Sequence, residues 1–279
     1  MSKPWIFVSP SNRGIGHALT RHLLRTTTLP IIATARADTS RVKDSILSSS
    51  NSDHIEYGPR LHVMQLDVTD ESSIEAASSK AAELFPPRTH HLHLGFALPG
   101  ILHPEKSPKQ VHYEGALETL KVNTLGPLML MKWFGEFLPR KGTDLSQLRS
   151  QDGSPAVGDE ISRLPQHATW LTNSGRVGST SDNRLGGWYS YRASKAGVNS
   201  ITKSFDLYLQ TRSAEKAVAM AYHPGTVKTG LSEEFWGNVR EGKLFSPEFA
   251  VEKMLEMVAG RKAKDRGRCW DWKGEEVLP

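Results

Sequence analysis

The chain has 279 residues, of which 38% are hydrophobic and 23% are charged, and its formal net charge is +5. This length suits one large α/β domain with a sizeable core, and the composition is ordinary for a soluble globular protein. No apolar run approaches the ~20 residues that a membrane-spanning helix needs. The single cysteine, Cys269, excludes an internal disulfide and suits a reducing compartment, so we expect a cytoplasmic protein.

Short apolar segments alternate with helical patterns along the chain, which is typical of a parallel sheet with crossover helices. Strands are expected at residues 5–8, 30–35, 61–66, 92–98, 168–172, 217–222 and 269–272. Helices are expected at residues 14–27, 70–84, 115–137 with an interruption at 126–127, 189–212 and 247–259. Residues 140–166 are polar and lack periodicity, so we expect them to form a surface insertion.

Five basic residues gather late in the sequence: Arg261, Lys262, Lys264, Arg266 and Arg268. Such a run could bind a polyanion, but a solvated loop between the last helix and the last strand is the favoured interpretation. The sequence carries no zinc-type spacing of Cys and His and no nucleic-acid-binding signature. We therefore expect no metal, nucleic acid or membrane among its partners.

Tyr191 and Lys195 stand four residues apart in a predicted helix, so their side chains share one face. An ammonium beside a phenol stabilises the phenolate and lowers a pKa that is normally about 10. Such a tyrosine can give or take a proton near neutral pH. Because both residue types are common on solvated helix faces, the pair needs support from the rest of the chain.

A Gly-containing turn joins the first strand to the first helix, in the order Ser9, Pro10, Ser11, Asn12, Arg13, Gly14, Ile15, Gly16. Glycines let the backbone approach a phosphate closely, and a helix N-terminus attracts anions. The turn therefore predicts a phosphate-binding corner. A tight turn that needs glycine only for packing is the alternative.

Five motifs in this order resemble the classical short-chain dehydrogenase/reductase family, from Ile6 to about Gly230. They are the corner Ser9–Gly16, Asp67-Val68 after the third strand, Asn123, the Tyr191/Lys195 pair and the Pro-Gly segment Pro224–Thr229. The resemblance implies a single Rossmann-type, doubly wound α/β domain over residues 1–279, with a seven-stranded, mostly parallel sheet and helices on both faces. Runs at 104–106, 174–179, 182–191 and 270–274 resemble the C-factor-like oxidoreductase subgroup.

The resemblance also implies roles for individual residues. Tyr191 would protonate the substrate oxygen, Ser174 would donate a hydrogen bond to it, and Lys195 would hold the nicotinamide ribose and lower the Tyr191 pKa. Asn123 would anchor a water molecule that links Lys195 to solvent. The residues implied to bind the cofactor are Ser9, Ser11, Asn12, Arg13, Gly14, Ile15, Gly16, Arg36, Asp67, Val68, Gly100, Asn123, Tyr191, Lys195, Pro224, Gly225, Val227 and Thr229.

Three positions depart from the family pattern. Pro10 replaces the first glycine of the corner and donates no N–H, which could weaken cofactor affinity. The segment 97–100 keeps only Gly100 of a motif whose asparagines tie the central strands together. Counting back from Gly178 places the usual catalytic serine at Gly175, whereas the subgroup pattern retains Ser174; we favour Ser174 over Ser179.

Charge indicates the cofactor preference. Arg36 follows the second strand, where an acidic residue would bind the ribose hydroxyls of NAD, and Arg13 lies in the corner. Two cations near the ribose favour the 2′-phosphate of NADP. A solvent-facing Arg36 is the alternative, but we expect NADP(H).

Together these features predict an NADPH-dependent reductase of a ketone or aldehyde. Two alternatives stay open: a non-reductive isomerase, dehydratase or cyclase, and a dinucleotide-binding regulator with vestigial catalysis. Residues 231–246 are expected to form a lid over the substrate cleft. Within this segment, Phe235, Trp236, Leu244 and Phe245 suggest an apolar or aromatic small molecule. The resemblance implies a homodimer or homotetramer.

Overall fold

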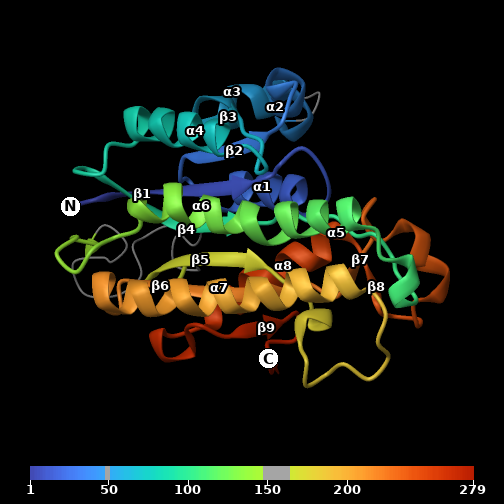
Figure 1. The fold of residues 1–279 in the computed structure, drawn as a ribbon. Coiled ribbons are helices and arrows are strands. Elements are labelled where there is room, and N and C mark those ends of the chain that lie inside the picture. The colour runs from blue at the N-terminus through green and yellow to red at the C-terminus, as the bar shows by residue number, and fades with distance from the viewer. Residues whose placement is uncertain (48–50, 147–163) are drawn as a thin grey trace.

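One eight-stranded sheet runs through the computed structural model, which describes residues 1–47, 51–146 and 164–279 (Figure 1). The strand order is β10-β9-β6-β5-β4-β1-β2-β3. Their bounds are Lys3–Ser9 (β1), Ile31–Ala35 (β2), Leu61–Gln65 (β3), His90–Ala97 (β4), Ala168–Asn173 (β5), Ala217–His223 (β6), Cys269–Asp271 (β9) and Glu276–Val277 (β10). Neighbouring strands pair in parallel, except that β10 is antiparallel to β9.

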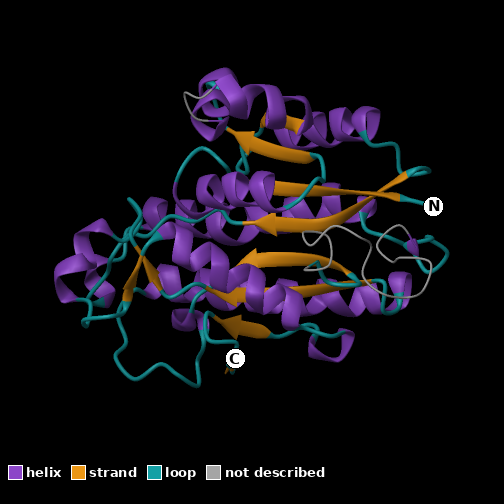
Figure 2. Cartoon of the chain, turned by 180° about the vertical axis from the view of Figure 1, so that it is seen from behind, coloured by secondary structure: helices purple, strands orange, loops and turns teal. Residues whose placement is uncertain are grey.

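Helices cover both faces of this sheet, as Figures 1 and 2 show from opposite sides. One face carries α1 (Gly14–Thr26) and α8 (Pro247–Gly260), which pack against each other. The other carries α4 (Glu71–Leu84), α5 (Tyr113–Leu120), α6 (Gly126–Phe134) and α7 (Tyr189–Ser213). Two short helices, α2 (Thr39–Leu47) and α3 (Asn51–Tyr57), connect β2 to β3.

The core has two layers because the parallel strands are buried on both faces. Ile6 and Val8 of β1 belong to the cluster that includes α1 and α8. Trp5 and Phe7, the alternate residues of the same strand, belong to the cluster that includes α4 and α6. The near-continuous apolar runs read in the sequence are therefore strands with two apolar faces.

The doubly wound α/β architecture is confirmed, with three corrections to its details. The sheet has an eighth strand, β10, whose two residues are too few to give a sequence pattern. The helix expected at 115–137 changes at Lys121–Leu125, a π-helical segment, rather than at the glycine and proline that follow. Pro127 follows this segment directly, at the start of α6. Helices α2 and α3 were not expected.

The predicted insertion at 140–166 falls largely on residues 147–163, which lie outside the described part of the chain. No helix among the described residues is long and apolar enough to cross a bilayer. Several apolar side chains on α5 and α7 are exposed: Tyr113, Leu117, Leu120, Leu207 and Tyr208. The homodimer or homotetramer stays a prediction.

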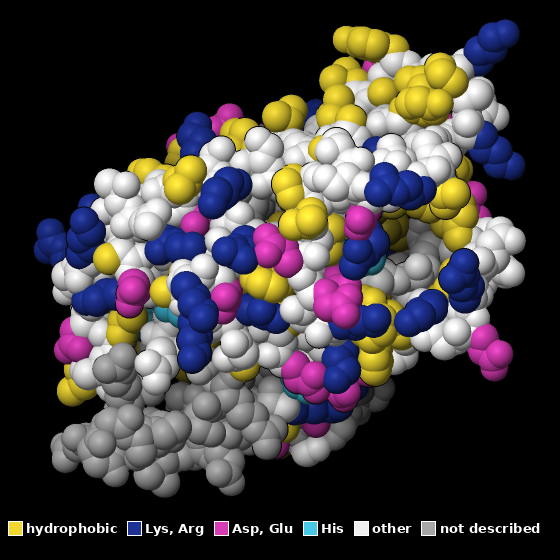
Figure 3. Space-filling view, turned by 90° about the horizontal axis from the view of Figure 1, so that it is seen from below, with side chains coloured by type: hydrophobic (Ala, Val, Ile, Leu, Met, Phe, Trp, Pro, Cys, Tyr) yellow, Lys and Arg dark blue, Asp and Glu magenta, His cyan; other side chains and the backbone are white. Residues whose placement is uncertain are grey.

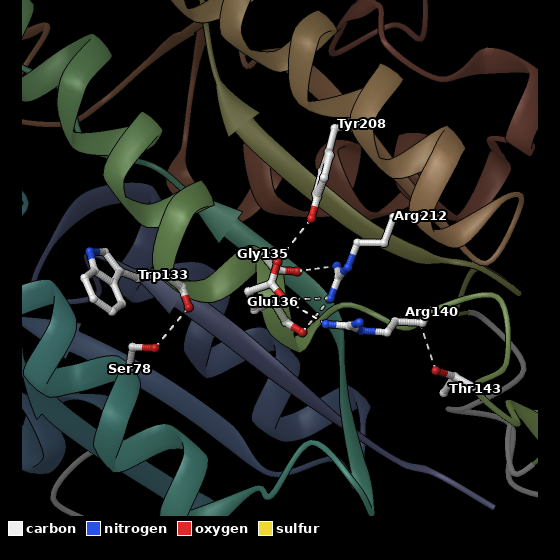
Figure 4. Close-up of polar contacts among 8 residues, drawn as sticks. All are labelled: Ser78, Trp133, Gly135, Glu136, Arg140, Thr143, Tyr208 and Arg212. Carbon is white, nitrogen blue, oxygen red and sulfur yellow. Dashed lines mark hydrogen bonds and ion pairs between the residues drawn. The ribbon is translucent and has the colours of Figure 1, made fainter.

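Arg212 fixes helix α7 to the end of α6 (Figure 4). Its guanidinium donates to the carbonyls of Gly135 and Glu136 at 2.9 and 2.8 Å. These carbonyls follow α6, where the last turn of a helix lacks intrahelical donors. Tyr208 and Arg140 also contact the Glu136 carboxylate, at 3.3 and 3.0 Å. Helix α7, which carries the Tyr–Lys pair, is thereby held along its C-terminal half.

The basic run 261–268 is largely used inside the fold. Arg266 pairs with the buried carboxylate of Asp206 on α7 at 2.8 Å. Arg261 lies 3.8 Å from the ring centroid of Trp270. On the face seen in Figure 3, basic and acidic side chains are interspersed. These contacts support the loop interpretation over a polyanion site.

Two buried histidines predict a loss of stability in acid. Burial lowers the pKa of His91 to about 4 and that of His93 to about 3, against 6.5 in the unfolded chain. The unfolded chain therefore binds more protons below pH 6.5, and the free energy of unfolding falls as the pH drops through this range. The free energy of unfolding falls by about 1.4 kcal/mol per pH unit for each histidine, and this is the slope to be measured.

Urea unfolding between pH 7.5 and 5 measures this slope. We expect His93→Gln to make it shallower and His54→Gln, at an exposed position, to leave it unchanged. Equal slopes in all three proteins would contradict the assignment.

Candidate active site

A cleft of about 310 Å³ opens at the C-terminal edge of the sheet, beside the switch in strand order between β1 and β4. Ligands of doubly wound sheets bind at this edge. The predicted cofactor residues that line it are Asn12, Arg13, Gly14, Ile15, Gly16, Arg36, Asp67, Val68, Gly100, Lys195 and Thr229. Ser9 and Ser11 are fully buried beneath it, and Pro224, Gly225, Val227 and Tyr191 are not among its lining residues.

The β1–α1 corner leaves the first helix open to the cleft. Arg13 is the N-cap residue of α1, and no side chain caps the helix. Its first amides are therefore available to an anion. Gly14 has a φ of +57°, and a Cβ atom on Gly16 would lie 1.8 Å from the Pro10 carbonyl oxygen. The corner thus requires both glycines, and Pro10, which joins Ser9 through a cis peptide bond, is part of its turn.

Two arginines stand at the rim of the same cleft. Arg13 and Arg36 both line it and are exposed. Neither forms an ion pair with a carboxylate of the described residues. Asp67, at the end of β3, accepts hydrogen bonds from the Thr69 amide and hydroxyl at 2.9 and 2.8 Å. Asp67, one of two acidic residues in the lining with Glu118, is therefore already hydrogen-bonded within its own turn.

Asn123 joins three parts of the site. It is fully buried in the π-helical segment, and such segments are frequent at functional sites. Its side chain accepts from the Ile101 amide at 2.8 Å and donates to the Ile101 carbonyl at 2.9 Å. It also donates to Ser194 Oγ on α7 at 3.0 Å. A Cβ atom on Gly100 would lie 3.9 Å from Asn123 Oδ1 and 3.8 Å from Lys195 Nζ.

Tyr191 and Lys195 share the inner face of α7, as their spacing predicts. Lys195 Nζ donates to the Asn173 carbonyl at 2.9 Å and lies 5.8 Å from the centre of the Tyr191 ring. Burial lowers the Lys195 pKa to about 8 and raises the Tyr191 pKa to about 12. The expected lowering of the Tyr191 pKa is therefore wrong for this structure, because burial outweighs an ammonium that is bound to a carbonyl instead.

Ser174 is turned toward the interior. It is 3% exposed, and its hydroxyl donates to Asn199 Oδ1 on α7 at 2.7 Å. The alternative, Ser179, is also buried and accepts from the Asp182 amide at 3.0 Å. A Cβ atom on Gly175 would lie 4.0 Å from Lys195 Cγ. Neither serine lines the cleft, so a hydrogen bond from Ser174 to a substrate requires its hydroxyl to leave Asn199.

Aromatic rings adjoin Tyr191 on one side. The Trp188 ring meets the Tyr191 ring edge-on at 6.1 Å between centroids, and Phe235 lies 5.1 Å from Trp188. Phe235 belongs to the 3₁₀ helix Glu233–Asn238, within the predicted lid. That segment is bracketed by a two-stranded sheet of β7 (Thr226–Val227) and β8 (Leu244–Phe245). Tyr189 is 42% exposed, so Tyr191 is the tyrosine that faces inward.

Sequence reasoning missed three polar groups of the site. The Asn173 carbonyl holds Lys195, Asn199 holds Ser174, and the Glu105 carboxylate accepts from the Ser190 amide at 2.8 Å. A backbone carbonyl gives no signal in residue type. Glu105 was noticed only for its resemblance to a subgroup pattern.

No protein-family model matches the chain. An uncharacterized oxidoreductase of Schizosaccharomyces pombe (strain 972) is 25% identical over 98% of this chain and 96% of its own length. C-signal of Myxococcus xanthus is 28% identical over 60% of this chain and 80% of its own length. The structure of an NADPH-bound carbonyl reductase from chicken fatty liver superimposes with a TM-score of 0.76 and 25% identity, over 100% of both chains.

The homologues of this chain are oxidoreductases of the short-chain dehydrogenase/reductase family, and its structural neighbours are carbonyl reductases of that family. The similarity to C-signal agrees with the predicted subgroup. The structure brings Tyr191, Lys195 and Asn123 together at one end of the sheet. All three lie where α7 and the π-helical segment meet the C-terminal ends of the strands.

Proposed function

We propose that this short-chain dehydrogenase/reductase is an NADPH-dependent enzyme that reduces a ketone or aldehyde to an alcohol. The observation that carries the proposal is the buried Tyr191/Lys195 pair beside a cleft whose phosphate corner is open. Lys195 itself lines that cleft. The similarity to a carbonyl reductase bound to NADPH supports the same assignment.

The residues of the cleft fit a dinucleotide phosphate. The uncapped N-terminus of α1 offers amides to the pyrophosphate, and the glycines keep the backbone free of side chains there. Arg13 and Arg36 offer unpaired guanidinium groups to a 2′-phosphate, which a neutral ribose would not need. Asp67 and Val68 would border the adenine. When bound, NADPH supplies the hydride.

The proton comes from this chain's own residues. Because burial holds the Tyr191 pKa at about 12, its phenol is protonated at neutral pH and can act as a general acid toward the substrate oxygen. The Lys195 ammonium then stabilises the phenolate that remains. Ser174 donates a second hydrogen bond once its hydroxyl leaves Asn199. Asn123 keeps the segment around Ile101 attached to α7.

The surroundings of Tyr191 favour an apolar or aromatic substrate. Trp188 and Phe235 form an apolar wall next to the phenol. A flat apolar group would gain both area burial and edge-to-face contacts with these rings. We therefore propose an aromatic or apolar carbonyl compound as the substrate class.

Tyr191→Phe tests the proton donor. The variant lacks the phenolic proton, so NADPH oxidation with a competent carbonyl should fall by roughly 10²–10⁴-fold while the Kd for NADPH changes little. Tyr189→Phe is the matched control and should keep normal turnover. Near-normal turnover of Tyr191→Phe would exclude this mechanism, and turnover without any nicotinamide would favour a non-reductive enzyme.

Ser174→Ala tests the second hydrogen bond. Loss of a donor to the developing oxyanion should lower kcat by about 10²–10³-fold and leave the KM for NADPH unchanged. Ser179→Ala, which removes an equally buried hydroxyl, should stay close to wild type. If Ser174→Ala keeps its kcat, the hydroxyl only holds Asn199.

Arg36→Ala tests the cofactor preference. Removing a charged hydrogen-bond donor to the 2′-phosphate should weaken NADPH binding by about 1.5–3 kcal/mol, roughly 10- to 100-fold, and leave NADH binding unchanged. Calorimetric titration with both nucleotides measures the difference. Arg41→Ala, at an exposed position on α2, is the control. An equal change for NADPH and NADH would show that Arg36 does not contact the phosphate.

A further inference from the structure

The first turn of α7 is capped by a residue from another loop. Its N-cap residue, Trp188, provides no side-chain cap. The first amides of any helix lack intrahelical acceptors. The Glu105 carboxylate, from the segment between β4 and α5, accepts from the Ser190 amide at 2.8 Å. An acidic group at this position also interacts favourably with the helix dipole.

Glu105 holds the same turn through its backbone. Its carbonyl accepts from the Trp188 amide at 2.6 Å. A Cβ atom on Gly187, whose φ is +67°, would lie 3.1 Å from that carbonyl oxygen, so glycine allows the close approach. Glu105 is only 4% exposed. A buried carboxylate needs such partners, because it has lost its hydration.

The capped turn sets the position of the proton donor. Tyr191 directly follows Ser190, and its ring meets the ring of Trp188. Trp188 has a left-handed backbone, with φ 49° and ψ 47°, which is disfavoured for a residue with a Cβ atom. The hydrogen bonds from Trp188 and Ser190 to Glu105 hold that conformation. Phe235 then packs on Trp188, so three loops meet at this turn.

We propose that Glu105 is a positioning residue that fixes Tyr191 for proton transfer by capping α7 from the segment between β4 and α5. The inference rests on the proposed reductase function. A hydrogen bond between segments 85 residues apart holds the helix start that carries the phenol. A small displacement of a catalytic group is enough to lower turnover strongly.

Substitutions at Glu105 separate the effect of side-chain length from the effect of charge. Glu105→Gln keeps an acceptor at the same distance and loses the charge, whereas Glu105→Asp keeps the charge but is one methylene too short. We expect Glu105→Asp and Glu105→Ala to lower kcat about tenfold or more, with the KM for NADPH within about twofold of wild type. Glu105→Gln should restore kcat to within about threefold.

Asp70→Ala is the matched control. Asp70 caps α4 by accepting from the Ser72 amide at 3.0 Å, so this variant also loses a helix cap, but away from Tyr191. Its melting temperature should fall while its kcat stays unchanged. An equal loss of kcat in Asp70→Ala would show a general effect of stability. Unchanged kcat in Glu105→Asp, or an equal loss in Glu105→Gln, would overturn the proposal.

Hydrogen exchange provides a readout that does not depend on turnover. The Ser190 and Tyr191 amides should exchange faster in Glu105→Asp than in wild type, and at the wild-type rate in Glu105→Gln. If the wild-type enzyme reduces no carbonyl, the proposed function fails while this exchange pattern still tests the cap. Unchanged exchange in Glu105→Asp would show that Glu105 does not hold the turn.

Discussion

The burial of the Lys195 ammonium is the constraint on which the rest of the site depends. A charged amine inside a protein loses its hydration, and here one backbone carbonyl, that of Asn173, accepts from it. This loss of hydration lowers the pKa of Lys195. The arrangement exists only if α7 packs tightly on the strands beneath it. Gly178, in the 3₁₀ turn after β5, lets α7 approach closely, since a Cβ atom there would lie 2.6 Å from the Lys195 carbonyl carbon.

Several contacts along α7 meet this requirement. Glu105 caps its start, Asp206 binds Arg266 near its end, and Arg212 holds the end of α6. In its first half, Thr124 donates to the Ser194 carbonyl at 2.9 Å. Each contact joins α7 to a different segment. The helix is therefore fixed along its length, and a displacement at one end is opposed by contacts at the other.

The raised pKa of Tyr191 is consistent with the proposed reduction, in which this tyrosine gives a proton. With a pKa of about 12, only about one Tyr191 side chain in 10⁵ is a phenolate at pH 7. The neutral phenol is the form that gives a proton to a developing alkoxide. Oxidation would need the phenolate as a base, which burial disfavours. In the proposed mechanism, the Lys195 ammonium would act after the proton has left, because only then would a negative charge face it.

The sequence predicted most elements because their apolar patterns reflect burial on one face or two. It located Tyr191 and Lys195 by the four-residue repeat of a helix, which is a local property. It could not predict the pKa of Tyr191, which depends on how deeply α7 is buried. Nor could it place the Ser174 hydroxyl, because Asn199 and a substrate oxygen are both reachable acceptors for a serine at a strand end.

The departures from the family pattern are offset by other bonds of the chain. The segment 97–100 lacks the asparagines that tie the central strands, but the Leu98 amide donates to the Ser9 carbonyl at 2.7 Å. The Thr34 hydroxyl donates to Ser9 Oγ at 2.8 Å, and the Ser11 amide to the Thr34 carbonyl at 2.7 Å. Backbone and hydroxyl groups thus join β1 to both its neighbours beneath the corner. Because these bonds lie below the open amides of α1, the altered corner can stay rigid without using the groups that would bind a phosphate.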